Sequence, residues 1–233
     1  MIKFINVCKE YKNNKILNDI NFEINKSEFV FITGSYGKST ILKLIYLIEK
    51  PDSGLILVKD ENINNYNFRK MQNYRKNIGF FSDELKILKD RNVYENLEFP
   101  LKLNKIKKKE RKEKIENLLE KFELTKIYEK KYNEISNSER IKTLICRAII
   151  TEPELILLDE ATAGLSENDE QKIMMYLYEL KLKKESTIIF ATNLQRILQN
   201  KCDKIIYLKD SEIIRITKGY VPELNEINLE EII

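Results

Sequence analysis

Histidine is absent from this chain of 233 residues. The absence excludes a metal site built on imidazole ligands and a histidine general base, although histidine is the usual proton carrier near neutral pH. Only three cysteines occur, Cys8, Cys146 and Cys202, and they lie far apart and outside any metal-binding motif. Such cysteines favour a reducing compartment over a secreted, disulfide-linked domain.

Long apolar runs are also missing. No stretch approaches the roughly 20 apolar residues of a membrane-spanning helix, and Asn, Lys and Glu interrupt the apolar residues near the start, so no signal peptide is expected. A role at a membrane would therefore require a partner. The net charge of +4, from 41 basic and 37 acidic residues, is too small to indicate a nucleic acid or a lipid surface. The length allows one large domain, or two intimate ones, with a sizeable core.

Short apolar runs alternate with helical periodicities along most of the chain. Two strands within residues 1–30, with a turn at 13–14, predict an antiparallel β part. Further strands are expected at 29–32, 55–58, 78–81, 155–158, 187–192, 205–208 and 213–216, and helices at about 39–50 and 167–183. This alternation predicts an α/β fold with a mostly parallel core sheet. Residues 59–76 give little signal.

Helical patterns dominate residues 84–148 and predict an inserted helical lobe. The expected core then comprises residues 1–83 and 149–216, and residues 217–233 form a tail. Within the lobe, Ile115, Leu118, Leu119 and Phe122 form one apolar face of a charged helix. Lysines at 105–114 are diluted by Glu110, Glu113 and Glu116, so a solvated surface helix explains them better than a nucleic-acid contact.

The most informative stretch is a strand that runs into a glycine turn and then into a helix. Glycines let backbone N–H groups approach a phosphate, and the helix N-terminus adds positive potential. A lysine after the second glycine would reach the outer phosphates, and the next hydroxyl would hold Mg²⁺. The predicted nucleotide-binding residues are Gly34, Ser35, Tyr36, Gly37, Lys38, Ser39 and Thr40. Ile32 stands where the full phosphate-loop pattern has its first glycine, so an ordinary strand-to-helix turn is the alternative.

A pair of carboxylates ends the apolar strand predicted at 155–158. Asp159 would hold Mg²⁺ together with Ser39, and Glu160 would polarise the attacking water. An acidic turn after a strand is common, so the pair alone indicates little. Together with the phosphate loop it predicts a P-loop nucleoside triphosphatase, in which Glu160, Asp159 and Lys38 are the catalytic residues.

At this point the sequence resembles the ATP-binding cassette (ABC) family, over roughly residues 2–216. The likeness rests on residues 28–34, 39–45, 90–96 and 154–160, and within the family it is strongest to the cell-division ATP-binding protein FtsE. The resemblance implies ATP and Mg²⁺ as cofactors, stacking of Tyr11 on adenine, and two subunits that sandwich two ATP molecules. It also implies an FtsX-like membrane subunit as partner, and a place at the cytoplasmic face of the membrane.

The phosphate loop from Gly34 to Lys38 is two residues shorter than the family's loop, and the chain departs from the family pattern at four further places. Asp83 stands where the family has a glutamine. The signature that meets the partner's nucleotide reads Ser136-Asn137-Ser138-Glu139 and has lost both glycines, although Ser136 and Glu139 also form a capping box that needs no ligand. Ser166 replaces an aspartate, and Asn193 replaces the switch histidine.

These departures weaken the parts that close the dimer and sense the terminal phosphate. Since losing one preorganised group costs on the order of 10²–10³ in rate, we expect weak turnover. The first hypothesis is an FtsE-like subunit that couples ATP to a membrane partner in cell division or envelope transport. The second is a degenerate cassette with a structural role, paired with itself or with an intact cassette. The third, a soluble cassette on nucleic acid, has the least support.

Overall fold

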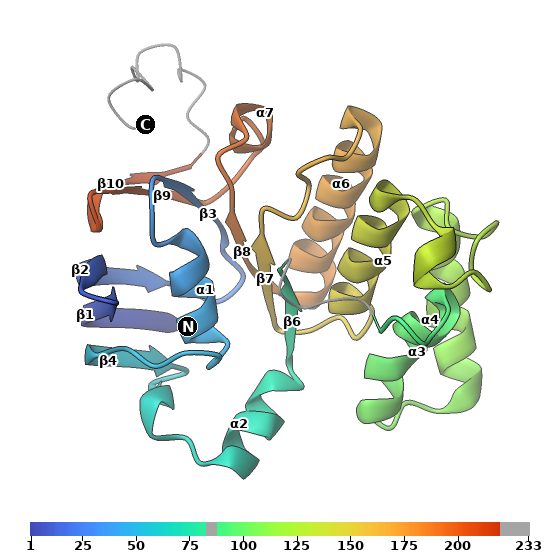
Figure 1. The fold of residues 1–233 in the computed structure, drawn as a ribbon, viewed down its shortest axis with the longest axis horizontal. Coiled ribbons are helices and arrows are strands. Elements are labelled where there is room, and N and C mark those ends of the chain that lie inside the picture. The colour runs from blue at the N-terminus through green and yellow to red at the C-terminus, as the bar shows by residue number, and fades with distance from the viewer. Residues whose placement is uncertain (83–87, 220–233) are drawn as a thin grey trace. The chain divides into compact units, whose positions relative to one another are not determined.

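The computed structural model describes residues 1–82 and 88–219. These residues divide into two compact units. The first contains residues 1–73, 157–160 and 187–219, and the second contains 74–156 (as far as described) and 161–186. The predicted α/β fold, with an antiparallel sheet and a mainly parallel sheet, is confirmed (Figure 1).

The antiparallel sheet of the first unit has the strand order β2-β1-β4-β5. Its members are β1 (Ile2–Tyr11), β2 (Asn14–Ile24), β4 (Ser53–Val58) and β5 (Glu61–Asn62). Ile2 of β1 lies opposite Ile24 of β2 on one side and Val58 of β4 on the other. The predicted pair of strands with a turn at 13–14 is therefore confirmed.

The mainly parallel strands of the first unit are centred on β3 (Phe29–Gly34), which lies between β8 (Thr187–Ala191) and β9 (Lys204–Lys209) and is parallel to both. All six residues of β3 are buried, which explains the unbroken apolar run from Phe29 to Ile32. The strand β10 (Glu212–Lys218) pairs antiparallel with β9, and β7 (Leu155–Asp159) is the neighbour of β8.

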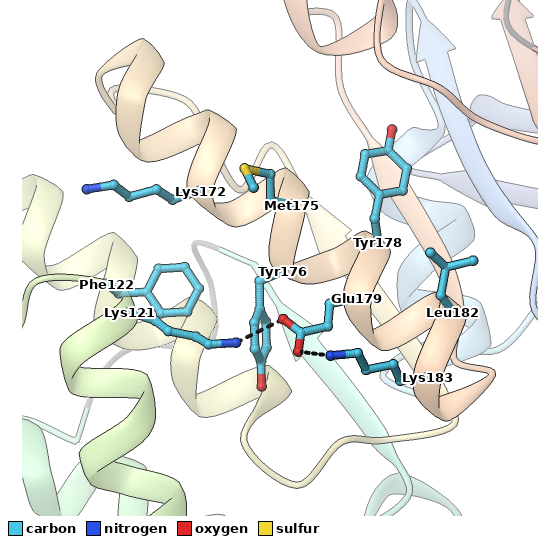
Figure 2. Close-up of a pocket in the computed structure, with 9 residues that line it drawn as sticks. All are labelled: Lys121, Phe122, Lys172, Met175, Tyr176, Tyr178, Glu179, Leu182 and Lys183. Atoms are coloured by element: carbon cyan, nitrogen blue, oxygen red, sulfur yellow. Dashed lines mark hydrogen bonds and ion pairs between the residues drawn. The ribbon is translucent and has the colours of Figure 1, made fainter.

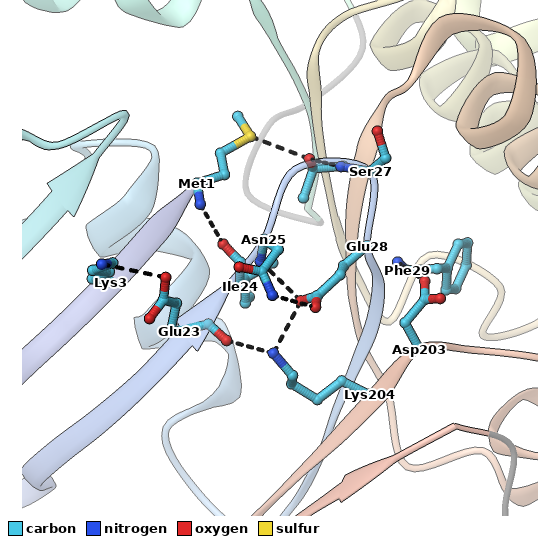
Figure 3. Close-up of polar contacts among 11 residues, drawn as sticks. Met1, Lys3, Glu23, Ile24, Asn25, Ser27, Glu28, Phe29, Asp203 and Lys204 are labelled. Atoms are coloured by element: carbon cyan, nitrogen blue, oxygen red, sulfur yellow. Dashed lines mark hydrogen bonds and ion pairs between the residues drawn. The ribbon is translucent and has the colours of Figure 1, made fainter.

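A polar network fixes the start of β3 (Figure 3). The buried Lys204 ammonium donates hydrogen bonds to the carbonyl of Glu23, at 2.6 Å, and to the carboxylate of Glu28, at 3.0 Å. The carboxylate of Asp203 accepts a hydrogen bond of 2.6 Å from the N–H of Phe29. Because a buried charge is costly unless it is paired and hydrogen-bonded, this network holds β3 in place at the end opposite the glycine turn.

The second unit is mostly helical. Its elements are β6 (Ile78–Phe81), α3 (Val93–Leu103), α4 (Lys108–Lys121), the short 3₁₀ helix η2 (Tyr132–Glu134), α5 (Asn137–Ile149) and α6 (Glu167–Lys184). The apolar face predicted on α4 is buried, and the predicted capping box at the start of α5 is present. No helix in residues 1–82 or 88–219 is long and apolar enough to span a membrane.

The helix expected at about 39–50 is present as α1 (Lys38–Ile45) and ends earlier than predicted. Several short elements were not predicted. The weakly patterned segment 59–76 contains β5, η1 (Ile63–Asn65) and α2 (Phe68–Arg75). Because α2 buries none of its residues, it carries no apolar period that would predict a helix. The four-residue helix α7 (Gln195–Leu198) is likewise too short to give a periodic signal.

Candidate functional site

The predicted phosphate loop connects β3 to α1 within the first unit. Gly34 and Gly37 both have positive φ angles, 113° and 100°, a conformation that glycine adopts readily. A Cβ atom at Gly34 would lie 1.8 Å from the carbonyl oxygen of Leu208. Gly37 precedes α1 and supplies no side-chain cap, so the first N–H groups of this helix have no side-chain acceptor from that position. Such a helix start suits an anion.

The ammonium group of Lys38 folds back onto the loop. It donates hydrogen bonds to the carbonyl oxygens of Gly34, at 2.7 Å, and Ser35, at 3.1 Å, and only 8% of the residue is exposed. Burial lowers the pKa of Lys38, while the nearby carboxylates of Glu160 and Asp159 oppose that shift. The Lys38 ammonium is thus bound to loop carbonyls and not to phosphate oxygens, which would otherwise attract it.

The acidic pair lies beside the loop in the same unit. The Ser39 hydroxyl donates a hydrogen bond of 2.9 Å to the carboxylate of Asp159. Burial raises the pKa of Asp159, Glu160 adds to that shift, and the hydrogen bond from Ser39 opposes it. A hydroxyl and a carboxylate at this separation are hard oxygen donors of the kind that Mg²⁺ takes together with phosphate. The two predicted metal ligands therefore fit the ion.

Glu160 is held by two contacts with the end of β8. Its N–H donates to the carbonyl of Ala191, at 2.9 Å, and its carboxylate accepts from the hydroxyl of the fully buried Thr192, at 3.0 Å. Its φ of 49° is unusual for a residue with a side chain. Strained backbone of this kind is found at functional sites where the surroundings enforce it. Sequence analysis missed Thr192, because only the folded sheet places its hydroxyl beside Glu160.

Asn193, at the switch position, follows Thr192 and turns toward the phosphate loop. Its side-chain oxygen accepts hydrogen bonds from the Thr33 hydroxyl, at 3.1 Å, and from the Gly34 N–H, at 3.0 Å. The sequence analysis named the position but not these contacts.

Tyr11 lies at the surface of the first unit, where 37% of the residue is exposed, so its ring stays available for stacking. Its hydroxyl donates a hydrogen bond to the carboxylate of Glu49, and burial together with that bond raises its pKa to about 12. The Lys9 ammonium lies 5.4 Å from the centre of the ring. Tyr36, in the loop, is 73% exposed. The stacking of Tyr11 on adenine stays a prediction.

The signature residues belong to the second unit, and Ser136 and Glu139 hydrogen-bond to one another. The Ser136 hydroxyl accepts from the N–H of Glu139, at 3.2 Å, and the Glu139 carboxylate accepts from the N–H of Ser136, at 2.6 Å. Ser166 caps α6 in a similar way through the N–H of Asp169, at 3.2 Å. These caps explain the residues structurally, and contact with a partner's nucleotide stays a prediction. Asp83 lies outside the described residues.

A groove of about 550 Å³ lies on the second unit between α6 and the end of α4 (Figure 2). Met175 and Leu182 are exposed along it, and Glu179 accepts hydrogen bonds from Lys121, at 2.9 Å, and Lys183, at 2.8 Å. Its lining includes neither a glycine turn nor an acidic pair.

The chain is similar to known proteins in both sequence and structure. A model of the ABC transporter family matches residues 17–163. The chain is 31% identical over 224 residues to the methionine import ATP-binding protein MetN of Francisella tularensis subsp. holarctica (strain OSU18), covering 94% of this chain and 64% of the relative. It is 28% identical over 230 residues to MetN 1 of Enterococcus faecalis (strain ATCC 700802 / V583), covering 97% and 62%. The chain thus spans somewhat less than two thirds of these curated relatives.

A solved structure agrees with the family match. The dimeric post-hydrolysis state of the ATP-binding cassette MJ0796, bound to ADP and Pi, matches with a TM-score of 0.87 and 29% identity, covering 94% of this chain and 98% of that one. The relatives named above are methionine import proteins, so the expected particular likeness to the cell-division protein FtsE is not supported.

Proposed function

The chain belongs to the ABC transporter family, and from that premise we propose that it is an ATP-binding, slowly hydrolysing subunit of a membrane complex. One observation carries the proposal. Lys38 and Ser39 of the phosphate loop lie in one unit with Asp159 and Glu160, and the Ser39 hydroxyl contacts the Asp159 carboxylate at 2.9 Å. The residues for phosphate binding, for Mg²⁺ and for water activation therefore come together.

Each residue then has a defined task. Lys38 would exchange the loop carbonyls for the outer phosphate oxygens, a charge-assisted contact that is stronger than a neutral one. Ser39 and Asp159 would hold Mg²⁺, which neutralises charge that develops on the phosphates. Glu160, held by Thr192 at 3.0 Å, would orient the attacking water and accept its proton.

Slow turnover is proposed because of the departures from the family pattern. Asn137 and Ser138 carry side chains where the signature has glycines, and Asn193 replaces a histidine. None of these three substitutions changes a residue that we assign to Mg²⁺ or to the attacking water. We therefore place the weakness in dimer closure and phosphate sensing, where each lost group costs on the order of 10²–10³ in rate.

The partners follow from the same premise. We propose a second cassette, identical or intact, and a membrane permease subunit. The curated relatives are import proteins for methionine, which favours uptake of a small molecule over cell division as the work of the complex. The FtsX-like partner was expected only from the likeness to FtsE. Since that likeness is not supported, we do not propose this partner. The subunit would lie at the cytoplasmic face of the membrane through its permease.

Calorimetry of Mg²⁺-ATP binding to the purified chain tests the proposal. We expect saturable binding that Lys38→Ala abolishes. Lys109→Ala is the matched control, because Lys109 is an exposed lysine of α4 in the second unit and its loss removes the same charge. Binding that survives Lys38→Ala would refute the site.

The degenerate cassette remains the second candidate, favoured by one observation. Lys38 is already bound to carbonyls of its own loop, at 2.7 and 3.1 Å, and a nucleotide must displace both contacts. Absence of binding at millimolar ATP would support this structural role over the ATPase.

A further inference from the structure

We propose that Asn193 positions the phosphate loop and does not sense the terminal phosphate. The inference deepens the proposed function and rests on it, since the loop must be the nucleotide site. It assigns to the amide oxygen of Asn193 the task of holding Gly34 in the orientation that β- and γ-phosphates require. The family resemblance implies a different task for this position, namely contact with the γ-phosphate.

The hydrogen bonds identify which end of the amide faces the loop. A backbone N–H can only donate, so the Asn193 atom that lies 3.0 Å from the Gly34 nitrogen must be the acceptor oxygen. The same oxygen accepts from the Thr33 hydroxyl at 3.1 Å. Two donors use the two lone pairs of that oxygen, and its orientation is fixed.

The two residues that directly follow β8 are joined to consecutive residues at the end of β3. The N–H of Thr192 donates to the carbonyl of Ile32, at 2.9 Å, and Asn193 then accepts from the next two residues, Thr33 and Gly34. The side chain of Asn193 thereby extends the backbone pairing of β8 with β3 past the end of the strand. We call these three hydrogen bonds the loop clasp.

On one side Gly34 is already restrained by β9, where it pairs with Leu208 and the Ser35 N–H donates to the Leu208 carbonyl at 3.0 Å. The clasp adds a restraint on the other side of Gly34. Its carbonyl is held by Lys38, at 2.7 Å, and that contact is lost when the ammonium turns to a phosphate. Gly34 to Lys38 is also two residues shorter than the corresponding part of the pattern G-x-x-x-x-G-K-[ST], so fewer N–H groups wrap the phosphate. The Gly34 N–H bond to Asn193 does not involve Lys38 and survives the exchange.

Comparing ADP with ATP separates the two roles. Asn193→Leu has a similar size but no acceptor, so it removes the side-chain part of the clasp. We expect its affinities for Mg²⁺-ADP and Mg²⁺-ATP to fall by the same factor, about tenfold, because both nucleotides use the loop. Isothermal calorimetry measures both. A sensor of the γ-phosphate would instead lose affinity for ATP alone, and that result would overturn the proposal.

Urea unfolding of the nucleotide-free protein tests the loop clasp independently of nucleotide binding. Asn193→Asp keeps an acceptor oxygen and loses the amide donor, so in high salt, which screens the added charge, its midpoint should stay near that of the wild type. Asn193→Leu should unfold at lower urea. Thr33→Val removes the hydroxyl, which is one of the two donors to the Asn193 oxygen. Its effect should be smaller in the Asn193→Leu background, since the two residues share one interaction.

The outcomes distinguish the inference from the proposed function. A wild-type chain that binds neither nucleotide would overturn the proposed function, and the unfolding series would then decide the clasp alone. A wild type that binds both, with Asn193→Leu unchanged in ADP affinity and in unfolding midpoint, would leave the proposed function intact and overturn the clasp.

Discussion

The Ser39 hydroxyl donates a hydrogen bond of 2.9 Å to the Asp159 carboxylate, although 120 positions separate the two residues in the chain. The contact joins the start of α1 to the end of β7 and places two oxygen atoms, the predicted Mg²⁺ ligands, beside the predicted phosphate loop. The Asp159 carboxylate is half-buried there, so that its charge is costly. A cation bound at this carboxylate would offset that cost.

Replacing this carboxylate should relieve the cost. Burial raises the pKa of Asp159 above its ordinary value of 3.8, Glu160 adds to the rise, and Ser39 opposes it. The folded chain thus binds the proton more tightly than the unfolded chain does. The stability that this proton contributes is present below about pH 3.8 and is lost as the pH rises through the folded pKa. In Asp159→Asn that loss is absent.

Urea unfolding without nucleotide at about pH 4 and pH 7 checks this prediction. The midpoint of the wild type should fall relative to that of Asp159→Asn as the pH rises, while the variant loses affinity for Mg²⁺-ATP. Asp90→Asn, at an exposed carboxylate of the second unit, makes the same change of charge and should follow the wild type. Parallel midpoints for wild type and Asp159→Asn at both pH values would contradict the argument.

Glu160→Gln should separate binding from hydrolysis. The amide keeps an oxygen that can accept the hydrogen bond from Thr192, but it cannot take a proton from water. We expect the single-turnover hydrolysis rate to fall by about 10²–10⁴ while ATP still binds, so that ATP-bound dimers accumulate. Rapid-quench kinetics and size-exclusion chromatography with ATP measure these effects. Equal hydrolysis rates for wild type and variant would remove Glu160 from the role of base.

Thr192→Val tests whether the orientation of Glu160 matters. Valine has the shape of threonine without the hydroxyl, so the carboxylate loses the donor that lies 3.0 Å away. The single-turnover rate should fall roughly tenfold or more, as expected when a catalytic group is slightly misplaced, and the affinity for Mg²⁺-ATP should change little. Thr192→Ser keeps the hydroxyl and should restore most of the rate. A loss of affinity as large as the loss of rate would indicate a general structural defect instead.

The sequence predicts the parts of this site that are formed by residues close together in the chain. Glycines before Lys38 and Ser39, between a strand and a helix, indicate a phosphate loop, and two carboxylates after an apolar strand indicate its partner. The structure confirms that Ser39 and Asp159 meet. The alternation of strands and helices also predicts the α/β fold, because periodicity reports which faces are buried.

The sequence does not predict contacts that only the folded sheet creates. Thr192 and Thr33 are ordinary strand residues until β8 and β3 lie side by side, and their hydroxyls then bind Glu160 and Asn193. The sequence also does not predict the hydrogen bond from Lys38 to the carbonyl of its own loop, since the same residues would be expected to bind a phosphate. The resemblance to FtsE was too fine a distinction for motifs that the whole family shares.

Gly34→Ala should damage the loop through a steric clash and not only through backbone strain. The φ angle of Gly34 is 113°, and an added Cβ would lie 1.8 Å from the Leu208 carbonyl oxygen. Because that oxygen is backbone and also accepts the Ser35 N–H at 3.0 Å, it cannot move aside without breaking the loop. We expect a lower urea midpoint and a loss of Mg²⁺-ADP affinity of about tenfold or more.

Gly219→Ala is the matched control for this clash. The φ of Gly219 is also positive, at 78°, but no atom of residues 1–82 or 88–217 lies within 4 Å of an added Cβ. Both variants share the conformational cost of alanine at positive φ, and only Gly34→Ala adds the collision with Leu208. The unfolding midpoint should therefore fall further for Gly34→Ala, and ADP affinity should fall for that variant alone. If the two variants lose equal stability and both bind ADP like the wild type, the close approach of Gly34 to Leu208 does not shape the site.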